Sequence, residues 1–321
     1  MKMATKIWLI IGAALVGGGL TIFTAVMTQY GWNFMKLGTQ TCETNIYEIG
    51  EEFSNVSLDT DTADIQFALS DDGKCRVECF EREKEKHFVG VEEGALVIKE
   101  TDERAWYDHI GIHFDSPNIK VYLPKAEYAA LAIKASTGDI EIAKDFKFEG
   151  SEISVSTGDI NFFACASGII KIKTSTGKIF VENISAGAIE LSASTGDITV
   201  SNVVCQGDVK TKITTGKTKL TDMECKNFTS KGTTGKVFLE NVIAQEKFSV
   251  ERNTGDVIFE RTDAAEIFVK TSTGDVKGSL LTDKVFITHT STGSIDVPKT
   301  MTGGRCEIST STGDIKITAS Q

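Results

Sequence analysis

A Thr-Gly dipeptide recurs along the chain at nearly constant spacing, and this repeat limits the possible folds more than any other feature. Successive glycines lie 19 or 20 residues apart, and the fullest motif is Ser-Thr-Gly-Asp-Ile. A repeat of 19 or 20 residues is too short for a helical crossover, so returning strands must stack on one another. The repeated glycines are Gly138, Gly158, Gly177, Gly196, Gly216, Gly235, Gly255, Gly274, Gly293 and Gly313.

Apolar and polar side chains alternate on both sides of these glycines. Positions two and four after the glycine are mostly apolar, as in Ile140 and Ile142. Positions seven and five before it are also apolar, as in Ile189 and Leu191. This period of two is typical of strands with one buried face, so each repeat is predicted to contain two short strands and two turns. A degenerate copy, with alanine in place of glycine, lies at residues 61–65.

These units predict an all-β fold: a β-solenoid, or single-stranded β-helix-like stack, of about eleven coils over residues 45–321. Equivalent side chains then form ladders that advance ~4.8 Å per coil. The glycine is expected to supply positive φ at a tight corner, and the threonine before it to form a ladder of hydroxyl hydrogen bonds. Both roles are structural and require no ligand.

The N-terminal segment is a candidate membrane anchor. The 29 residues between Lys6 and Lys36 carry no charge. A helix over residues 7–30, rising ~1.5 Å per residue, would cross the hydrocarbon core of a bilayer. The alternative is a cleaved signal peptide, whose apolar region is usually shorter. The span is followed by a linker at residues 31–44.

Charge predicts both the orientation and the excluded partners. Lys2 and Lys6 precede the span, so residues 1–6 are expected in the cytoplasm and the solenoid outside the cell, on a single-pass membrane protein. The chain has 34 Lys and Arg against 45 Asp and Glu, a net charge of -11. Such an acidic chain is not expected to bind nucleic acid.

The repeat is interrupted between about residues 71 and 124. Residues 75–80 and 95–99 alternate like strands, and residues 81–86 form a mixed-charge run that predicts a solvated turn or edge. A solenoid has to cover the apolar face of its terminal coil. The block is therefore expected to be a hairpin insertion that caps the first coil.

The seven cysteines do not indicate a disulfide framework, because their number is odd and no Cys-x-x-Cys pair is present. Cys75 and Cys79 would lie ~13 Å apart along a strand, too far for a mutual bridge. Cys205 and Cys225 stand nine residues after a repeat glycine, where most coils have small side chains. They are expected to be free thiols in a tight corner.

The Ser-Thr-Gly-Asp-Ile repeat, together with the preceding segment Asn-Ile-Lys-Val-Tyr-Leu-Pro at residues 118–124, resembles a bacterial putative-adhesin family. This is domain of unknown function 4097 (DUF4097), described as toastrack-like. The resemblance covers about residues 45–321. It implies a β-solenoid on a surface-exposed or membrane-tethered protein, with a role in adhesion or envelope stress. The family provides no catalytic residues.

The position after the repeat glycine is the main candidate for chemistry. Aspartates of neighbouring coils, such as Asp139 and Asp159 or Asp256 and Asp275, would lie ~5 Å apart. Retaining glycosidases use such a separation, and Ca²⁺ can be shared by such a pair. The structural interpretation, which we adopt, is that these aspartates favour turns and that interleaved lysines neutralise the ladder. Four copies lack the aspartate and have Lys178, Lys217, Lys236 and Ser294 instead.

The remaining metal-ligand candidates are His109, His113 and Asp115. On a strand they would share one face, but the two histidines would be ~13 Å apart and could not hold one ion without a bend. The segment is predicted to be the polar face of a hairpin. No nucleophile, phosphate-loop or metalloprotease motif occurs, so neither a cofactor nor a metal is expected.

The prediction for function is a non-enzymatic, membrane-anchored bacterial surface protein. Its solenoid would bind another protein, a cell-wall polymer or a neighbouring copy, in adhesion or in an envelope-stress scaffold. The alternative is a polysaccharide-acting β-helix enzyme, a lyase or glycosidase, which needs a groove flanked by long loops. The even spacing after Gly138 leaves no room for such loops.

The chain ends at residues 315–321, directly after a full repeat, so the last coil in sequence is expected to be the open end of the stack. An exposed edge strand pairs with any compatible strand unless it is blunted. Lys316 and the short final strand would blunt it. Otherwise self-association through the C-terminal coil is expected.

Overall fold

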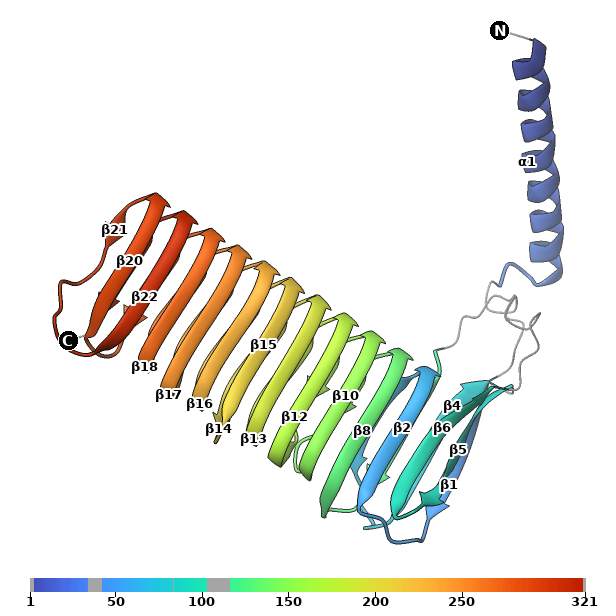
Figure 1. The fold of residues 1–321 in the computed structure, drawn as a ribbon. Helices are drawn as coiled ribbons and strands as arrows, with labels where there is room; N and C mark the ends of the chain where they lie inside the picture. The colour runs from blue at the N-terminus through green and yellow to red at the C-terminus, as the bar shows by residue number, and fades with distance from the viewer. Residues whose placement is uncertain (1–2, 34–41, 83, 103–115, 320–321) are drawn as a thin grey trace.

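The computed structural model describes residues 3–33, 42–82, 84–102 and 116–319 (Figure 1). One helix, α1 (Met3–Gln29), is followed by strands that all belong to one continuous sheet, wound into a solenoid. The strands are β1 (Cys42–Ile49), β2 (Asn55–Thr62), β3 (Asp64–Leu69), β4 (Cys75–Arg82), β5 (Glu85–Glu92), β6 (Ala95–Asp102), β7 (Asn118–Leu123), β8 (Glu127–Thr137), β9 (Ile140–Ile142), β10 (Lys147–Thr157), β11 (Ile160–Phe162), β12 (Cys165–Thr176), β13 (Ile179–Thr195), β14 (Ile198–Cys205), β15 (Asp208–Thr215), β16 (Thr218–Thr234), β17 (Val237–Thr254), β18 (Val257–Thr273), β19 (Val276–Leu280), β20 (Lys284–Thr292), β21 (Ile295–Asp296), β22 (Gly304–Thr312) and β23 (Ile315–Ala319).

The helix α1 is apolar around its whole circumference. Its segment Thr5–Gln29 contains an 18-residue window with a mean hydropathy of 2.1, no residue of which is buried. The hydroxyl of Thr21 donates to the carbonyl of Gly17 at 2.8 Å, and that of Thr24 to Leu20 at 2.9 Å. Polar groups are thus satisfied within the helix, as a lipid environment requires. A helix of this length and composition serves either as a membrane anchor or as a signal sequence.

The solenoid stacks its strands in parallel and in register. Ile140, Ile160, Ile179 and Ile198 pair along one ladder, and all four side chains are fully buried. The predicted inward rows are therefore confirmed. A continuous apolar core runs along the axis of the stack, since each coil buries the apolar face of its neighbours.

Two turns per coil were predicted, but the position of the second was not. It lies six residues after the repeat glycine, where Asn183, Asn202, Asp222 and Asn241 adopt φ between 51° and 57°. Asparagine and aspartate tolerate this left-handed conformation better than other side chains. The amide of Asn202 donates to Oδ1 of Asn183 at 2.6 Å, and that of Asn241 to Asp222 at 2.7 Å. Ladder pairing continues through this corner, so several strands are longer than predicted, up to the 18 residues of β17.

The repeat glycines form the first corner, as predicted. Gly196 has φ 135°, and a Cβ atom there would lie 1.8 Å from the carbonyl oxygen of Gly177 in the preceding coil. The predicted ladder of threonine hydroxyls is wrong for the described residues. The threonine carbonyl is used instead: Gly196 N donates to Thr215 O at 3.1 Å, and the other repeat corners have equivalent bonds.

The N-terminal end of the stack is covered. The degenerate copy forms the first coil, because β2 and β3 pair in parallel with β8 and β9, and Ala63 N donates to Thr137 O at 3.0 Å. On the other side of this coil, β6 pairs with β2 and β7 pairs with β3. Antiparallel strands β4, β5 and β1 then extend the sheet, as Figure 1 shows. We call β1 and β4–β7 the cap.

The expectation that the last coil in sequence is the open end is wrong. Strand β22 lies between β18 and β20, and β23 lies between β19 and β21. The end coil in space is β20–β21, where the side chain of Ile295 is 46% exposed. One inward position fits this order: Ile308 of β22 is fully buried, whereas its partner in β20 is Thr288.

Candidate functional site

The aspartates that follow the repeat glycines were the first candidates for chemistry, and each side chain is engaged in the coil stack. The backbone N–H of Asp159 donates to Oδ1 of Asp139 at 2.8 Å, and that of Lys178 donates to Oδ1 of Asp159 at 2.7 Å. Lys217 N donates in the same way to Asp197 at 2.8 Å. These carboxylates satisfy backbone donors at the corners, which is a structural role.

Three aspartates of this row have lowered pKa values. A hydrogen bond from Lys236 holds the pKa of Asp256 below its ordinary value, and one from Lys277 does the same for Asp275. The amide of Ser294 lowers the pKa of Asp314. The acid of a glycosidase needs the opposite shift, a raised pKa that keeps its proton at neutral pH. Asp256, Asp275 and Asp314 therefore lack this property of a catalytic acid.

We expect acid to weaken the stack through these carboxylates. A lowered pKa in the folded state means that their stabilisation is present above the unfolded value, about 3.9, and is lost as the pH falls through the folded value. Asp275→Asn should therefore flatten the loss of melting temperature between neutral pH and pH ~3. Asp71→Asn, in the turn after β3, is the control. Parallel pH profiles for Asp275→Asn and the wild type would contradict the role.

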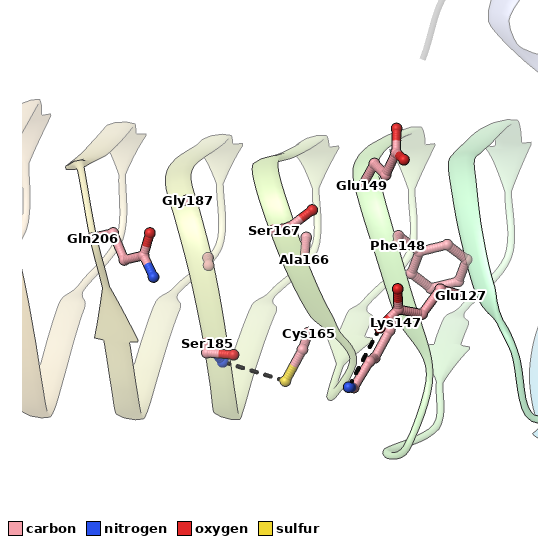
Figure 2. A pocket seen from close by; sticks show the side chains of 11 residues that line it. Glu127, Lys147, Phe148, Glu149, Cys165, Ala166, Ser167, Ser185, Gly187 and Gln206 are labelled. Carbon is pink, nitrogen blue, oxygen red and sulfur yellow. Dashed lines mark hydrogen bonds and ion pairs between the residues drawn. The ribbon is translucent and has the colours of Figure 1, made fainter.

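A shallow hollow lies along the opposite corner, over the starts of β10 and β12 and the middle of β13 (Figure 2). Its volume is about 320 Å³. Lys147 forms an ion pair with Glu127 at 3.4 Å, and Ser185 N donates to Sγ of Cys165 at 3.3 Å. No histidine is among the lining residues, and among the described residues the half-buried thiol of Cys165 forms a hydrogen bond only with the backbone N–H of Ser185. The hollow has the groups for weak contacts but not for nucleophilic catalysis.

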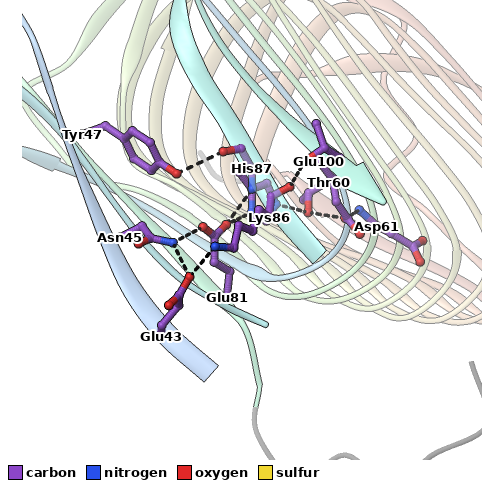
Figure 3. Close-up of polar contacts among 10 residues, drawn as sticks. Glu43, Asn45, Tyr47, Thr60, Asp61, Glu81, Lys86, His87 and Glu100 are labelled. Atoms are coloured by element: carbon purple, nitrogen blue, oxygen red, sulfur yellow. Dashed lines mark hydrogen bonds and ion pairs between the residues drawn. The ribbon is translucent and has the colours of Figure 1, made fainter. Parts of the chain in front are cut away.

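A buried polar network occupies the cap (Figure 3). Glu81 is fully buried, and its Oε1 accepts from Nδ2 of Asn45 at 2.7 Å. Its Oε2 accepts from both the backbone N and Nδ1 of His87, each at 2.7 Å. The prediction that residues 81–86 form a solvated run is therefore wrong at Glu81. Burial raises the pKa of Glu81, but hydrogen bonds from His87 and Asn45 outweigh it and hold the pKa below the ordinary value.

The network continues from His87 into the first coil. Nε2 of His87 lies 2.9 Å from the hydroxyl of Thr60, which donates to Glu100 at 3.1 Å. The hydroxyl of Tyr47 donates to the carbonyl of His87 at 3.2 Å, and burial raises the pKa of Tyr47 to about 12. Residues from β1, β2, β4, β5 and β6 are thus joined, which ties the cap to the solenoid.

The same place holds a cluster of potential metal ligands. One ligand atom from each of Cys79, Glu81 and His87 lies within 4.8 Å of the others, and all three residues are buried. Sulfur, oxygen and nitrogen donors of this kind suit zinc. However, Glu81 and His87 already bond to each other, and burial raises the pKa of Cys79 to about 12, which disfavours the thiolate. We therefore interpret the cluster as the polar core of the cap.

Other predicted residues are placed as follows. His109, His113 and Asp115 lie outside the described residues. The prediction of free thiols is confirmed for Cys205 and Cys225, which are buried and unpaired by any disulfide in the structure.

Charge is distributed unevenly along the solenoid. Residues 171–236 contain ten lysines against six carboxylates, although the whole chain has a net charge of -11. The sequence prediction considered the overall charge only and missed this basic middle section. The lysines at the aspartate position, Lys178, Lys217 and Lys236, belong to it.

Comparison with known proteins agrees with the architecture. The model of the Toastrack DUF4097 family matches residues 53–213 and 189–321. The chain is similar in structure to a putative lipid binding protein from Parabacteroides distasonis, with 15% identity, 88% of this chain and 98% of that chain covered, and a TM-score of 0.50. It is also similar to a putative adhesin from Parabacteroides merdae, with 15% identity, coverage of 75% and 97%, and a TM-score of 0.51. At such identities the likeness concerns the fold alone. No curated protein matches the sequence.

Proposed function

The chain belongs to the Toastrack DUF4097 family, and from that premise we propose that it is a non-catalytic, membrane-anchored bacterial surface protein whose solenoid binds a partner in adhesion. The observation that carries the proposal is the use of the repeat carboxylates. Those of Asp139, Asp159 and Asp197 accept backbone N–H groups of the next coil, so they stabilise the stack. The outer faces of the coils form a long, regular surface, which suits the binding of a partner.

The helix α1 supplies the anchor in this proposal. The lysines at its start support a cytoplasmic N-terminus, with the solenoid outside, by the positive-inside rule. Protease added to intact cells that produce the full-length protein should then digest the solenoid. Protection of the solenoid until the cells are lysed would contradict this orientation.

Two assays separate binding from catalysis. Cells that produce the full-length protein should attach to a host-cell or cell-wall surface more strongly than cells that lack it. The purified full-length protein should release no sugar from cell-wall polysaccharides. Because a glycosidase or lyase would need the repeat carboxylates, turnover that Asp159→Asn abolishes would overturn the proposal in favour of the enzyme.

A further inference from the structure

Three corners of the solenoid share a sequence that the others lack. The shared sequence is Lys-x-Ser/Thr-Thr-Gly-Lys, which occurs at residues 173–178, 212–217 and 231–236. One lysine stands four residues before the corner glycine and the other directly after it, with two hydroxyl residues between them. All six lysines are exposed. Each corner therefore presents two ammonium groups on either side of a pair of hydroxyls.

The strand register stacks these corners on one side of the solenoid. Lys173 pairs with Ser192, which pairs with Lys212, and Lys212 pairs with Lys231. Lys173 and Lys212 are thus two coils apart, a separation of ~10 Å at ~4.8 Å per coil. The smaller Ser192 between them leaves a hollow of about 310 Å³, which both lysines line. The arrangement is a charged groove that runs across the coils.

Most neighbouring lysines are neutralised, but those of the first two corners are not. Lys231 pairs with Glu251 at 3.3 Å and Lys236 with Asp256 at 2.8 Å. By contrast, the ammonium groups of Lys173, Lys178, Lys212 and Lys217 form no ion pair in the described part of the chain. The carboxylates of Asp159 and Asp197 bond to the backbone N–H groups of Lys178 and Lys217 and not to their ammonium groups. We call these four residues the lysine corners. Their charges are uncompensated in an otherwise acidic protein.

We propose that the lysine corners bind a linear polyol-phosphate polymer of the cell envelope. The proposal rests on the proposed function and names the class of its partner. Lysine binds phosphate as a point charge, whereas arginine is the usual choice for bidentate carboxylate pairs, and residues 171–236 contain no arginine. The corner hydroxyls are placed to donate to phosphate oxygens between the two ammonium groups.

The distribution of charge favours a polymer over a flat anionic membrane. A bilayer along this side would also meet the first coil and the coil of the cap, where the negative charge is concentrated: residues 42–102 contain 17 Asp and Glu against six Lys and Arg. A narrow chain can follow the groove across Lys173 and Lys212 and avoid those coils. The partner is therefore a strand of repeating phosphodiesters rather than a lipid surface.

The test measures binding of fluorescent synthetic poly(glycerol phosphate) to the full-length protein in uncharged detergent. With about four phosphate contacts and the coefficient for single-stranded polyanions, Kd should rise ~50-fold between about 50 and 200 mM salt. The variant K173Q/K178Q/K212Q/K217Q should lose at least ~10-fold in affinity at low salt and most of the salt dependence. A matched variant, K99Q/K125Q/K144Q/K316Q, removes the same charge elsewhere and should stay within ~2-fold of the wild type.

Each other outcome counts against the proposal. Equal losses in the two variants would mean that net charge alone attracts the polymer. Binding to phosphatidylcholine vesicles that contain phosphatidylglycerol, without binding to the polymer, would assign the lysine corners to a membrane. If the protein binds neither the polymer nor the vesicles, the lysine corners are not a binding site. The adhesion proposal would then be decided by the attachment assay alone. Melting curves of both variants confirm that they fold.

Discussion

Replacing Gly196 by valine should destabilise the protein by about 3 kcal/mol or more. Two effects act together at this corner. The φ of 135° is one that a β-branched residue rarely adopts, and the new Cβ would lie 1.8 Å from the carbonyl oxygen of Gly177. The obstacle is backbone rather than a flexible side chain, so relief requires moving two coils apart. That movement would break the bond from Gly177 N to Thr195 O.

The control for this substitution is Gly150→Val in β10. There φ is not positive, and a Cβ would meet its nearest atom, Ile169 O, at 3.7 Å, an ordinary contact. Thermal melts of the two full-length variants should differ clearly, with Gly196→Val much the lower. Equal midpoints would show that the corner does not depend on glycine.

Much of the solenoid could be predicted because its evidence is local and repeated. The spacing of the Thr-Gly motif sets the length of a coil, and alternation around residues such as Ile189 and Leu191 sets the buried face. Ten copies average out the irregularities of any one coil. The Asn and Asp row six residues after the glycine was also visible in the sequence. It was missed because an isolated asparagine indicates a turn only weakly.

The order of the last coils could not be read from spacing. The corners at Gly293 and Gly313 carry similar motifs, so either coil could follow the one at Gly274. The choice depends on packing between residues far apart in sequence. Asp275 accepts the N–H of Asp314 at 2.8 Å, and Asp314 in turn accepts that of Ser294 at 2.7 Å. In the sequence, the inward residues Thr288 and Ile308 were the indication that the coil of β20, and not that of β22, ends the stack.

The cap network was hidden for a related reason. In the sequence, Glu81 begins a run of alternating charges, which usually indicates a solvated segment. Its burial depends on partners from other strands, namely Asn45 of β1 and His87 of β5. A carboxylate can be buried when three donors meet it, but pairing across strands is not visible in local charge patterning.

Replacing Glu81 by alanine should destabilise the protein by about 3–5 kcal/mol, because removing a buried carboxylate leaves its buried hydrogen-bond donors unsatisfied. Asn45 Nδ2, His87 N and His87 Nδ1 would all lose their acceptor at once. The loss should be greatest in the cap. Opening of the cap would expose Cys79, which is fully buried in the folded protein.

Two measurements on the full-length protein check this result. The melting midpoint should fall well below that of Glu92→Ala, an exposed carboxylate at the end of β5 and the matched control. Mass spectrometry of alkylated protein should show faster labelling of Cys79 in Glu81→Ala than in the control, while labelling of Cys225, in the middle of the solenoid, stays slow. If both cysteines react at control rates and the midpoint is unchanged, Glu81 does not hold the cap to the first coil. If both react faster together, the network supports the whole stack, and the cap is not a separate unit of stability.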